Sequence, residues 1–130
     1  MNGVKFLLDT NIIIGLYERY PDTLALLKVK QVTIKECAYS AITRIELLSY
    51  PALTAVDKQA IESLLNCMTY LAITSAIENE TIAFRILHKT KLPDSIIAAT
   101  AKYHELELLT LDKKFAEKLG NPKAFKSQRC

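Results

Sequence analysis

The fold of this chain follows from one stretch near its beginning, Val4-Lys5-Phe6-Leu7-Leu8-Asp9-Thr10-Asn11. The apolar run that ends at Leu8 predicts a short buried strand. Asp9, Thr10 and Asn11 then favour a turn and a helix N-cap, and residues 12–19 are predicted to be helical up to the region of Pro21. A strand that passes directly into a helix is typical of a parallel β-α-β arrangement.

The same alternation continues along the rest of the chain. Strands are predicted over residues 37–42, 70–73 and 106–110, with residues 124–126 as a marginal fifth. Helices are predicted over residues 22–30, 43–50 (capped by Thr43), 56–68, 75–89, 95–104 and 113–119. The pattern predicts an α/β fold of three layers, with a central, mainly parallel sheet of four to five strands and helices on both faces.

Length and composition are those of one soluble domain. The chain has 130 residues, half of them hydrophobic, and we expect residues 1–130 to form a single domain. No apolar run approaches the ~20 residues that a membrane-spanning helix needs, and the three cysteines have no zinc-binding spacing. We therefore expect a cytoplasmic protein. The net charge is only +3, but basic residues outnumber acidic ones after Asp112, which suits phosphate or a solvated surface equally well.

Four acidic residues stand at positions from which they can converge. Asp9 and Asp112 follow predicted strands, whereas Asp94 and Glu46 lie on helices that can lean over the same edge of the sheet. Functional residues of such sheets gather beyond the carboxyl ends of the strands. Helix capping explains any single Asp at a helix start, but Glu46, flanked by Ile45 and Leu47, is harder to explain in that way.

Convergence of these acids predicts a metal site. Two carboxylates ~4 Å apart repel by ~4 kcal/mol at a typical effective dielectric, so the group needs raised pKa values or a divalent cation. Ligands that are all oxygen select Mg²⁺ or Mn²⁺ over zinc. One or two such ions would activate water for hydrolysis of a phosphodiester.

Four segments of the chain resemble the ordered motifs of PIN domains, and the nearest resemblance is to the VapC-type toxins of bacterial and archaeal toxin–antitoxin pairs. The segments are residues 7–11 (LLDTN), 40–47 (SAITRIEL), 92–101 (LPDSIIAATA) and 109–115 (LTLDKKF). They occur in the family order and span essentially the whole chain. In a common family form Asn stands at the position of Asp112 and an acid follows nearby.

The resemblance implies a function and a set of residues. Asp9, Glu46, Asp94 and Asp112 would be the catalytic, metal-binding acids of an endoribonuclease that cleaves structured RNA such as transfer or ribosomal RNA. It also implies inhibition by a small VapB-like antitoxin and assembly as a homodimer. The supporting polar residues would be Thr10, Asn11, Ser95 and Thr110.

Basic residues near these motifs are candidates for contact with the phosphates of RNA. Arg44 and Lys113 lie within two of the motifs, and Arg85 lies on a predicted helix. A surface ion pair or a solvated helix start is the ordinary alternative for each of them.

Three other classes of protein share features of this sequence. A non-catalytic PIN-like module that only binds RNA or protein has the same fold. A phosphatase of the haloacid-dehalogenase type also carries an Asp after its first strand, but it needs a second acid where this chain has Asn11. A receiver domain needs an Asp after its middle strand, where this chain has Thr74 and Ser75.

Overall fold

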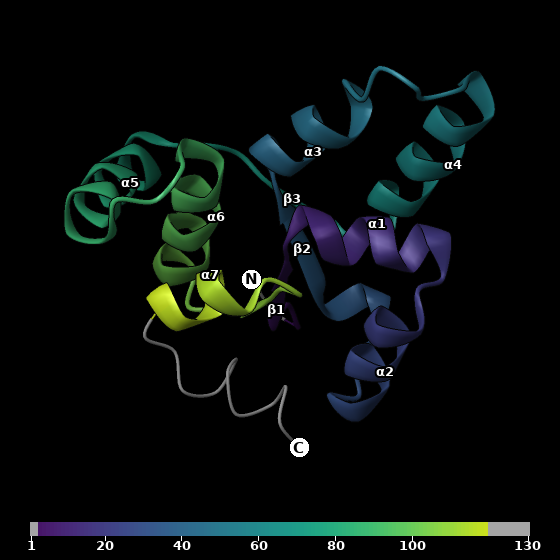
Figure 1. Ribbon diagram of the computed structural model, residues 1–130, viewed down its shortest axis with the longest axis horizontal. Helices are drawn as coiled ribbons and strands as arrows, with labels where there is room; N and C mark the ends of the chain where they lie inside the picture. Colours follow the sequence, from purple (N-terminus) through teal and green to yellow (C-terminus); the bar gives the residue numbers. More distant parts are fainter. Residues whose placement is uncertain (1–2, 120–130) are drawn as a thin grey trace.

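A four-stranded parallel sheet forms the centre of the molecule in the computed structural model, which describes residues 3–119 (Figure 1). The strand order is β3-β2-β1-β4, and all three neighbouring pairs are parallel. The strands are β1 (Phe6–Leu8), β2 (Cys37–Ser40), β3 (Thr69–Leu71) and β4 (Glu107–Leu109). The predicted α/β fold and its parallel sheet are confirmed, and the fifth strand predicted at residues 124–126 lies outside the described residues.

Helices cover both faces of the sheet. Figure 1 shows α5, α6 and α7 on one side and α1, α2 and α4 on the other, with α3 between the two groups. The helices are α1 (Thr10–Glu18), α2 (Pro21–Val29), α3 (Ala41–Leu48), α4 (Ala55–Asn66), α5 (Ser75–His88), α6 (Leu92–Tyr103), α7 (Lys113–Lys118) and the 3₁₀ helix η1 (Ile34–Glu36). Among residues 3–119, no helix has the length and apolar character that crossing a bilayer requires.

Successive residues of each strand point to opposite faces of the sheet and so divide the core into two clusters. Phe6 and Leu8 pack with residues of α1 and α4 in one cluster. Leu7, between them, packs with Ile97 and Ala101 of α6 in the other. Because both faces of β1 are covered, this strand has no polar face, and the unbroken apolar run of residues 6–8 is what such a strand requires.

The start of α3 differs from the sequence prediction. Ser40 is the N-cap, and its side-chain oxygen accepts a hydrogen bond from the Ile42 backbone nitrogen at 3.2 Å. Thr43, which we expected to cap this helix, lies inside its first turn and is fully buried. The helix begins earlier because β2 ends at Ser40, so the chain passes from strand to helix without a loop.

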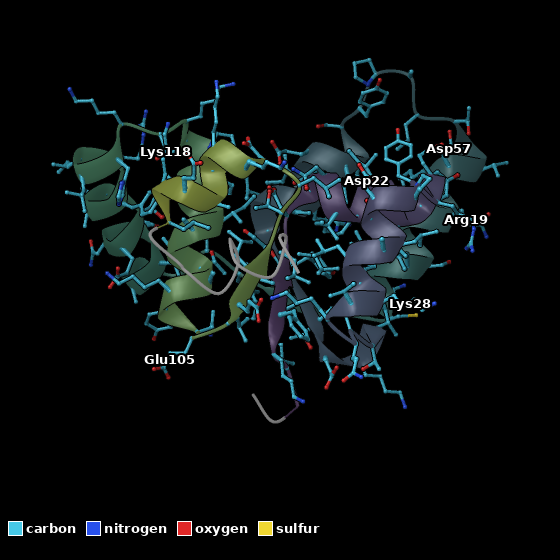
Figure 2. The ribbon with its side chains drawn as sticks, turned by 60° about the horizontal axis from the view of Figure 1, so that its bottom comes forward. Arg19, Asp22, Lys28, Asp57, Glu105 and Lys118 are labelled. Atoms are coloured by element: carbon cyan, nitrogen blue, oxygen red, sulfur yellow. The ribbon has the colours of Figure 1, made fainter. Side chains whose placement is uncertain are left out.

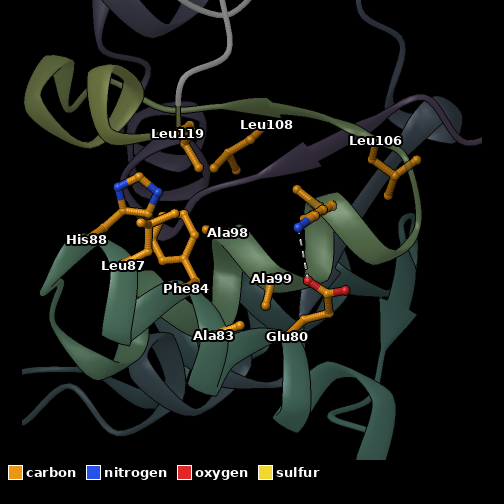
Figure 3. Close-up of a pocket in the computed structure, with 12 residues that line it drawn as sticks. Glu80, Ala83, Phe84, Leu87, His88, Ala98, Ala99, Leu106, Leu108 and Leu119 are labelled. Carbon is orange, nitrogen blue, oxygen red and sulfur yellow. Dashed lines mark ion pairs between the residues drawn. The ribbon is translucent and has the colours of Figure 1, made fainter.

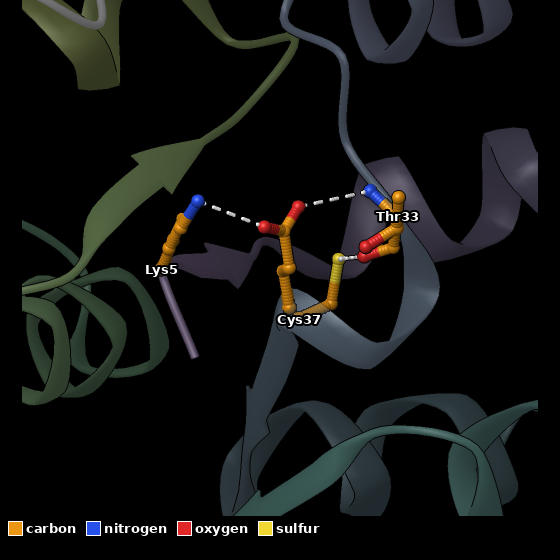
Figure 4. Close-up of polar contacts among 4 residues, drawn as sticks. Lys5, Thr33 and Cys37 are labelled. Atoms are coloured by element: carbon orange, nitrogen blue, oxygen red, sulfur yellow. Dashed lines mark hydrogen bonds and ion pairs between the residues drawn. The ribbon is translucent and has the colours of Figure 1, made fainter. Parts of the chain in front are cut away.

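At the opposite end of the sheet, Glu36 joins the start of β2 to β1. Its carboxylate forms an ion pair with Lys5 at 2.9 Å and accepts a hydrogen bond from the Thr33 backbone nitrogen at 3.3 Å (Figure 4). Hydrogen bonding and the charge of Lys5 hold the pKa of Glu36 below its usual value. Lys30, just after α2, pairs in the same region with Glu107 of β4. These contacts fix the amino ends of the strands.

A cavity of about 360 Å³ lies between α5 and α6 (Figure 3). Its walls are mainly apolar and include Phe84, Ala98 and Leu119, and an ion pair between Glu80 and Lys102 at 3.3 Å stands at its edge. None of the four acids proposed from the sequence lines it. The cavity is a packing feature beneath α5, separate from the polar end of the sheet.

Helices α1 and α2 pack closely at Gly15. A Cβ atom added at Gly15 would stand 2.0 Å from the Thr23 hydroxyl oxygen and 2.8 Å from its Cβ. Thr23 is fully buried, and its hydroxyl has no hydrogen-bond partner within the described part of the chain. Position 15 therefore requires glycine, and within residues 3–119 the close packing leaves the Thr23 hydroxyl without a hydrogen bond.

Two substitutions at this contact are expected to have opposite effects. Gly15→Ala should lower the free energy of unfolding by about 1–3 kcal/mol, because the added methyl group overlaps Thr23.

Thr23→Val keeps the shape of the side chain and removes the unpaired hydroxyl, so it should raise the free energy of unfolding by about 1 kcal/mol. Urea denaturation of the two variants measures both values. Equal stability of Gly15→Ala and wild type would contradict the close packing.

Candidate metal centre

The carboxyl ends of β1 and β4 meet at the point where the strand order reverses. Strands β2 and β3 lie successively on one side of β1, and β4 lies on the other side. Leu8 pairs with Leu109, so Asp9 and Thr110, the next residues of the two strands, emerge side by side. The site predicted beyond the carboxyl ends of the strands therefore starts from two residues that are 101 positions apart in sequence.

Asp9 forms the buried floor of this region. Only 6% of its surface is exposed, and it is the N-cap of α1. Its Oδ1 accepts a hydrogen bond from the Thr10 backbone nitrogen at 2.7 Å, and its Oδ2 accepts one from the Thr110 hydroxyl, also at 2.7 Å. The capping role considered from the sequence is therefore real, but it uses only one of the two carboxylate oxygens.

Asn11 connects the same two strand ends. Its side-chain nitrogen donates to Asp9 Oδ2 and to Thr110 Oγ1, each at 3.3 Å, while its Oδ1 accepts from the Leu111 backbone nitrogen at 3.1 Å. The Thr110 hydroxyl also accepts a hydrogen bond from the Asp112 backbone nitrogen at 3.0 Å. Asn11 and Thr110 thus hold the carboxylate of Asp9 in one orientation.

Glu46 reaches the region from α3. Its Oε1 accepts a hydrogen bond from the Thr10 hydroxyl at 2.7 Å, and that hydroxyl lies 3.1 Å from the buried Thr43 hydroxyl. Since a carboxylate only accepts, the single hydroxyl proton of Thr10 is committed to Glu46. Thr43 is a polar residue of this site that the sequence reasoning missed, because we took it for a helix cap. Its position one turn before Glu46 is the signal that indicates otherwise.

Asp94 and Asp112 complete the group from the other side. Asp94 lies in the first turn of α6 and is partly exposed, whereas Asp112 is an exposed N-cap of α7 whose Oδ1 accepts from the Phe115 backbone nitrogen at 3.1 Å. In the four carboxylates (Asp9, Glu46, Asp94 and Asp112), burial decreases from the floor at Asp9 to the rim at Glu46 and Asp112.

Mutual repulsion connects the four carboxylates. Burial raises the pKa of Asp9 to about 6, and the negative charges of Asp94 and Glu46 add to the effect against the hydrogen bonds from Thr110 and Thr10. Burial also raises the pKa of Asp94, with the charges of Asp112 and Glu46 contributing. Each acid therefore lies within electrostatic range of at least one other.

The donor chemistry fits a hard divalent cation. All four groups are carboxylates, which suit Mg²⁺ or Mn²⁺ rather than zinc. Within residues 3–119, no three acidic, histidine or cysteine side chains stand at the spacing of a ready-made metal site. Glu46 accepts a hydrogen bond from the Thr10 hydroxyl and Asp112 accepts one from the Phe115 backbone nitrogen, and each bond uses one carboxylate oxygen and leaves the other available to a cation.

Other residues singled out from the sequence lie elsewhere. Ser95 is fully buried, and its hydroxyl donates to the Lys91 carbonyl oxygen at 2.8 Å and contacts Thr90, so it stabilises the turn before α6 rather than a carboxylate. Arg85 donates to the Thr90 carbonyl oxygen at 3.2 Å. Arg44 lies 3.9 Å from Glu62 of α4. Lys113 is exposed beside Asp112.

Residues 6–119 match the family model of the PIN domain. The chain belongs to the PIN-domain family. This membership agrees with the sheet, with the order of the four motifs and with their meeting at one end of the strands. It also removes the haloacid-dehalogenase type of phosphatase, which was an alternative from the sequence alone. No curated protein sequence matches the chain.

Solved structures similar to this PIN domain include chains from toxin–antitoxin systems. A toxin–antitoxin complex from Klebsiella pneumoniae contains a chain that is 33% identical, with a TM-score of 0.74 over 85% of this chain and 88% of that one. FitAcB from Neisseria gonorrhoeae is 24% identical, with a TM-score of 0.69 over 88% and 93%. DNA-bound VapBC from Salmonella typhimurium is 20% identical, with a TM-score of 0.68 over 88% and 91%, and these last two show the fold alone.

The raised pKa of Asp9 leads to a pH-dependent stability that Asp9→Asn should remove. In the metal-free protein the folded state binds more protons than the unfolded state between about pH 4 and pH 6, so this residue makes the free energy of unfolding fall as the pH rises. The stability of Asp9→Asn relative to wild type should therefore increase by up to about 3 kcal/mol between these limits.

Urea denaturation of both proteins in excess chelator measures the difference at several pH values. Glu105→Gln is the matched control, because Glu105 is exposed and precedes β4 at the opposite end of the sheet from the acids (Figure 2). A difference between Asp9→Asn and wild type that stays constant with pH would contradict the assignment.

Proposed function

We propose that this PIN-domain protein is a metal-dependent endoribonuclease and the toxin of a VapBC-type toxin–antitoxin pair. The observation that carries the proposal is the group of four carboxylates around Asp9, which mixes buried and exposed acids at the carboxyl ends of β1 and β4. Mutual repulsion makes such a group costly unless a cation neutralises it. Structured RNA, such as transfer or ribosomal RNA, is the proposed substrate.

Each carboxylate would contribute according to its position. Asp9 would be a rigid ligand, because Thr110 and Asn11 hold its Oδ2 while leaving lone pairs free. Glu46, Asp94 and Asp112 would be adjustable ligands at the exposed rim. The hydrogen bond from Thr10 orients Glu46 and also lowers its freedom to turn away from the site.

One or two bound Mg²⁺ or Mn²⁺ ions would lower the pKa of a water molecule and offset the negative charge that develops on the phosphate. The chain itself supplies the ligands and holds them in place before substrate arrives. Because ligation needs deprotonated carboxylates, affinity for the cation should increase as the pH rises through about 6, where Asp9 loses its proton.

Asp9→Asn is expected to abolish RNA cleavage. The substitution removes one negative charge and one acceptor from the buried floor of the site, and the rate should fall by at least about a hundredfold. Excess chelator should stop cleavage by the wild-type protein, and Mn²⁺ or Mg²⁺ should restore it. Mn²⁺ should also raise the midpoint of thermal unfolding of wild type more than that of Asp9→Asn, which reports binding without activity.

Glu105→Gln, remote from the site, should cleave RNA at the wild-type rate. Mapping of RNA 5′ ends after brief expression of wild type and Asp9→Asn would identify the bond that is cut. Cleavage that persists in excess chelator would falsify the metal mechanism. Equal growth arrest by the two proteins would instead favour the alternative, a non-catalytic PIN-like module that binds RNA or protein.

A groove beside Glu46 supports the proposal of an antitoxin partner. It has a volume of about 250 Å³ and lies between α1, α3 and the start of α4. Its lining combines large apolar groups such as Ile14, Tyr20 and Tyr50, which are exposed, with acidic groups such as Glu18. An amphipathic segment with basic residues would fit this surface and would reach the carboxylates at Glu46. The chain from the Klebsiella pneumoniae complex, named above, provides the precedent for such a partner.

Tyr50→Asp should uncouple toxicity from neutralisation. Tyr50 lies on the groove rather than among the four carboxylates, so purified Tyr50→Asp should cleave RNA as wild type does. Its affinity for the antitoxin should fall by at least about tenfold, because the substitution removes the aromatic ring and would bury a charged carboxylate against the apolar face of the segment. Co-purification and titration calorimetry test this expectation. Unchanged affinity would exclude the groove as the docking surface.

The proposed homodimer has a candidate interface on α5. Ile82, Ile86 and Leu87 of this helix are all largely exposed, the last two by about three quarters. Large exposed apolar side chains on one helix are typical of a surface that is covered in an assembly. We include a homodimer in the proposed function on this ground and on the family resemblance.

A further inference from the structure

We propose that Lys91 and Lys118 form a phosphate-binding edge, so that an RNA backbone reaches the four carboxylates across α6 and α7. This inference rests on the proposed nuclease function and deepens it by giving the substrate a side of approach. The two lysines were not among the basic residues that the sequence analysis selected.

Both lysines belong to the elements that carry the outer acids. Lys91 is the N-cap residue of α6 and stands three positions before Asp94, a spacing that makes the two side chains neighbours at the start of a helix. Lys118 is the last residue of α7, whose N-cap is Asp112. Figure 2 shows Lys118 at the end of the molecule opposite Glu105. Lys91 therefore stands beside Asp94, and Lys118 stands at the other end of the six-residue helix that begins after Asp112.

The positive charges of the two lysines also act on the carboxylate of Asp94. The charges of Lys91 and Lys118 lower the pKa of Asp94, against the stronger effects of burial and of the neighbouring acids. A phosphodiester that approaches four carboxylates is repelled by them, so it needs positive charge from the protein at the same place.

Both lysines are available to an incoming anion. They are exposed, and the ion pairs found in residues 3–119 involve four other basic residues: Lys5, Lys30, Arg44 and Lys102. Of the arginines considered earlier, Arg44 faces Glu62 and Arg85 is bonded to the Thr90 carbonyl oxygen. Lys91 and Lys118 therefore join Lys113, which the sequence analysis selected, as exposed lysines near the outer acids.

The two sides of the site differ in charge, and this difference decides the direction of approach. Three further lysines, all exposed, continue the positive surface around the start of α6 and along α7: Lys89, Lys113 and Lys114. The opposite side, next to Glu46, is the apolar and acidic groove that includes Ile14, Glu18 and Asp57. A phosphate backbone is attracted to the first surface and repelled by the second.

The test is the salt dependence of RNA binding to the full chain in excess chelator, where cleavage does not interfere. A fluorescently labelled RNA hairpin is the probe, and fluorescence anisotropy gives the dissociation constant. The double variant Lys91→Gln/Lys118→Gln should bind about tenfold or more weakly at moderate salt. The slope of log K against log salt concentration should fall by about 1.5 to 2, because two phosphate contacts are lost.

The matched control removes two positive charges at a remote place. Lys28→Gln/Lys35→Gln changes two exposed lysines that precede β2, Lys28 in α2 (Figure 2) and Lys35 in η1, and should keep the wild-type slope. Lys91→Arg/Lys118→Arg keeps the charge and should restore binding. In the presence of Mg²⁺, the Gln double variant should lose about tenfold in kcat/KM while kcat at saturating RNA stays within about twofold of wild type.

The outcomes separate this inference from the proposed function. Wild-type cleavage together with an unchanged salt slope in the Gln double variant would overturn the phosphate-binding edge and leave the nuclease proposal standing. If the Gln double variant and the lysine control lose equal RNA affinity and equal salt slope, the effect depends only on net charge. That result would also overturn the phosphate-binding edge. A wild-type protein that neither binds nor cleaves the RNA would overturn both.

Discussion

The hydrogen bond from Thr110 to Asp9 is the contact on which the rest of the site depends. It joins the ends of β1 and β4, which pair only because the chain returns to the far side of β1 after three helix-containing crossovers. Asn11 strengthens the same junction by bonding to Asp9, Thr110 and Leu111. With this junction in place, α1 and α7 begin at fixed positions, and their N-cap acids are held beside each other.

Burial of Asp9 opposes the stability of the fold in the absence of a cation. The carboxylate is buried away from water and lies near the charges of two other acids, so its ionised form is disfavoured. The hydrogen bonds from Thr10 and Thr110 offset part of this cost. Such local conflict between stability and charge is typical of a functional site. A divalent cation would remove the conflict, because it converts repulsion between ligands into attraction to a common centre.

The surroundings of the site divide into two chemically different sides. The side formed by α1, α3 and α4 has a groove with apolar and acidic groups, and the side formed by α6 and α7 is rich in lysine. The proposed RNA and the proposed antitoxin would therefore approach the site from different directions and meet at the same carboxylates. Competition between the two then needs no conformational change, because occupation of Glu46 by a partner would obstruct the site directly.

Much of the architecture and the group of acids follow from the sequence. Apolar runs of three to five residues determine the buried strands, and the polar residues after them determine the turns, because these effects depend on neighbours along the chain. That is why Asp9, Asp94 and Asp112 could be placed at helix starts. The order of the motifs indicated the PIN-domain family, and the match of residues 6–119 to the family model confirms it.

The tertiary structure alone decided which polar groups meet. Thr43 became a buried partner of Thr10, and Ser95 stabilised a turn instead of a carboxylate. The proximity of Lys118 to Asp94 likewise arises from the placement of α7 beside α6, whereas Lys91 is a neighbour of Asp94 along the chain. Sequence patterns determine which face of an element is buried. The contact between two particular side chains depends on how elements pack across the sheet, and residues close in the fold but distant in the chain leave no local pattern.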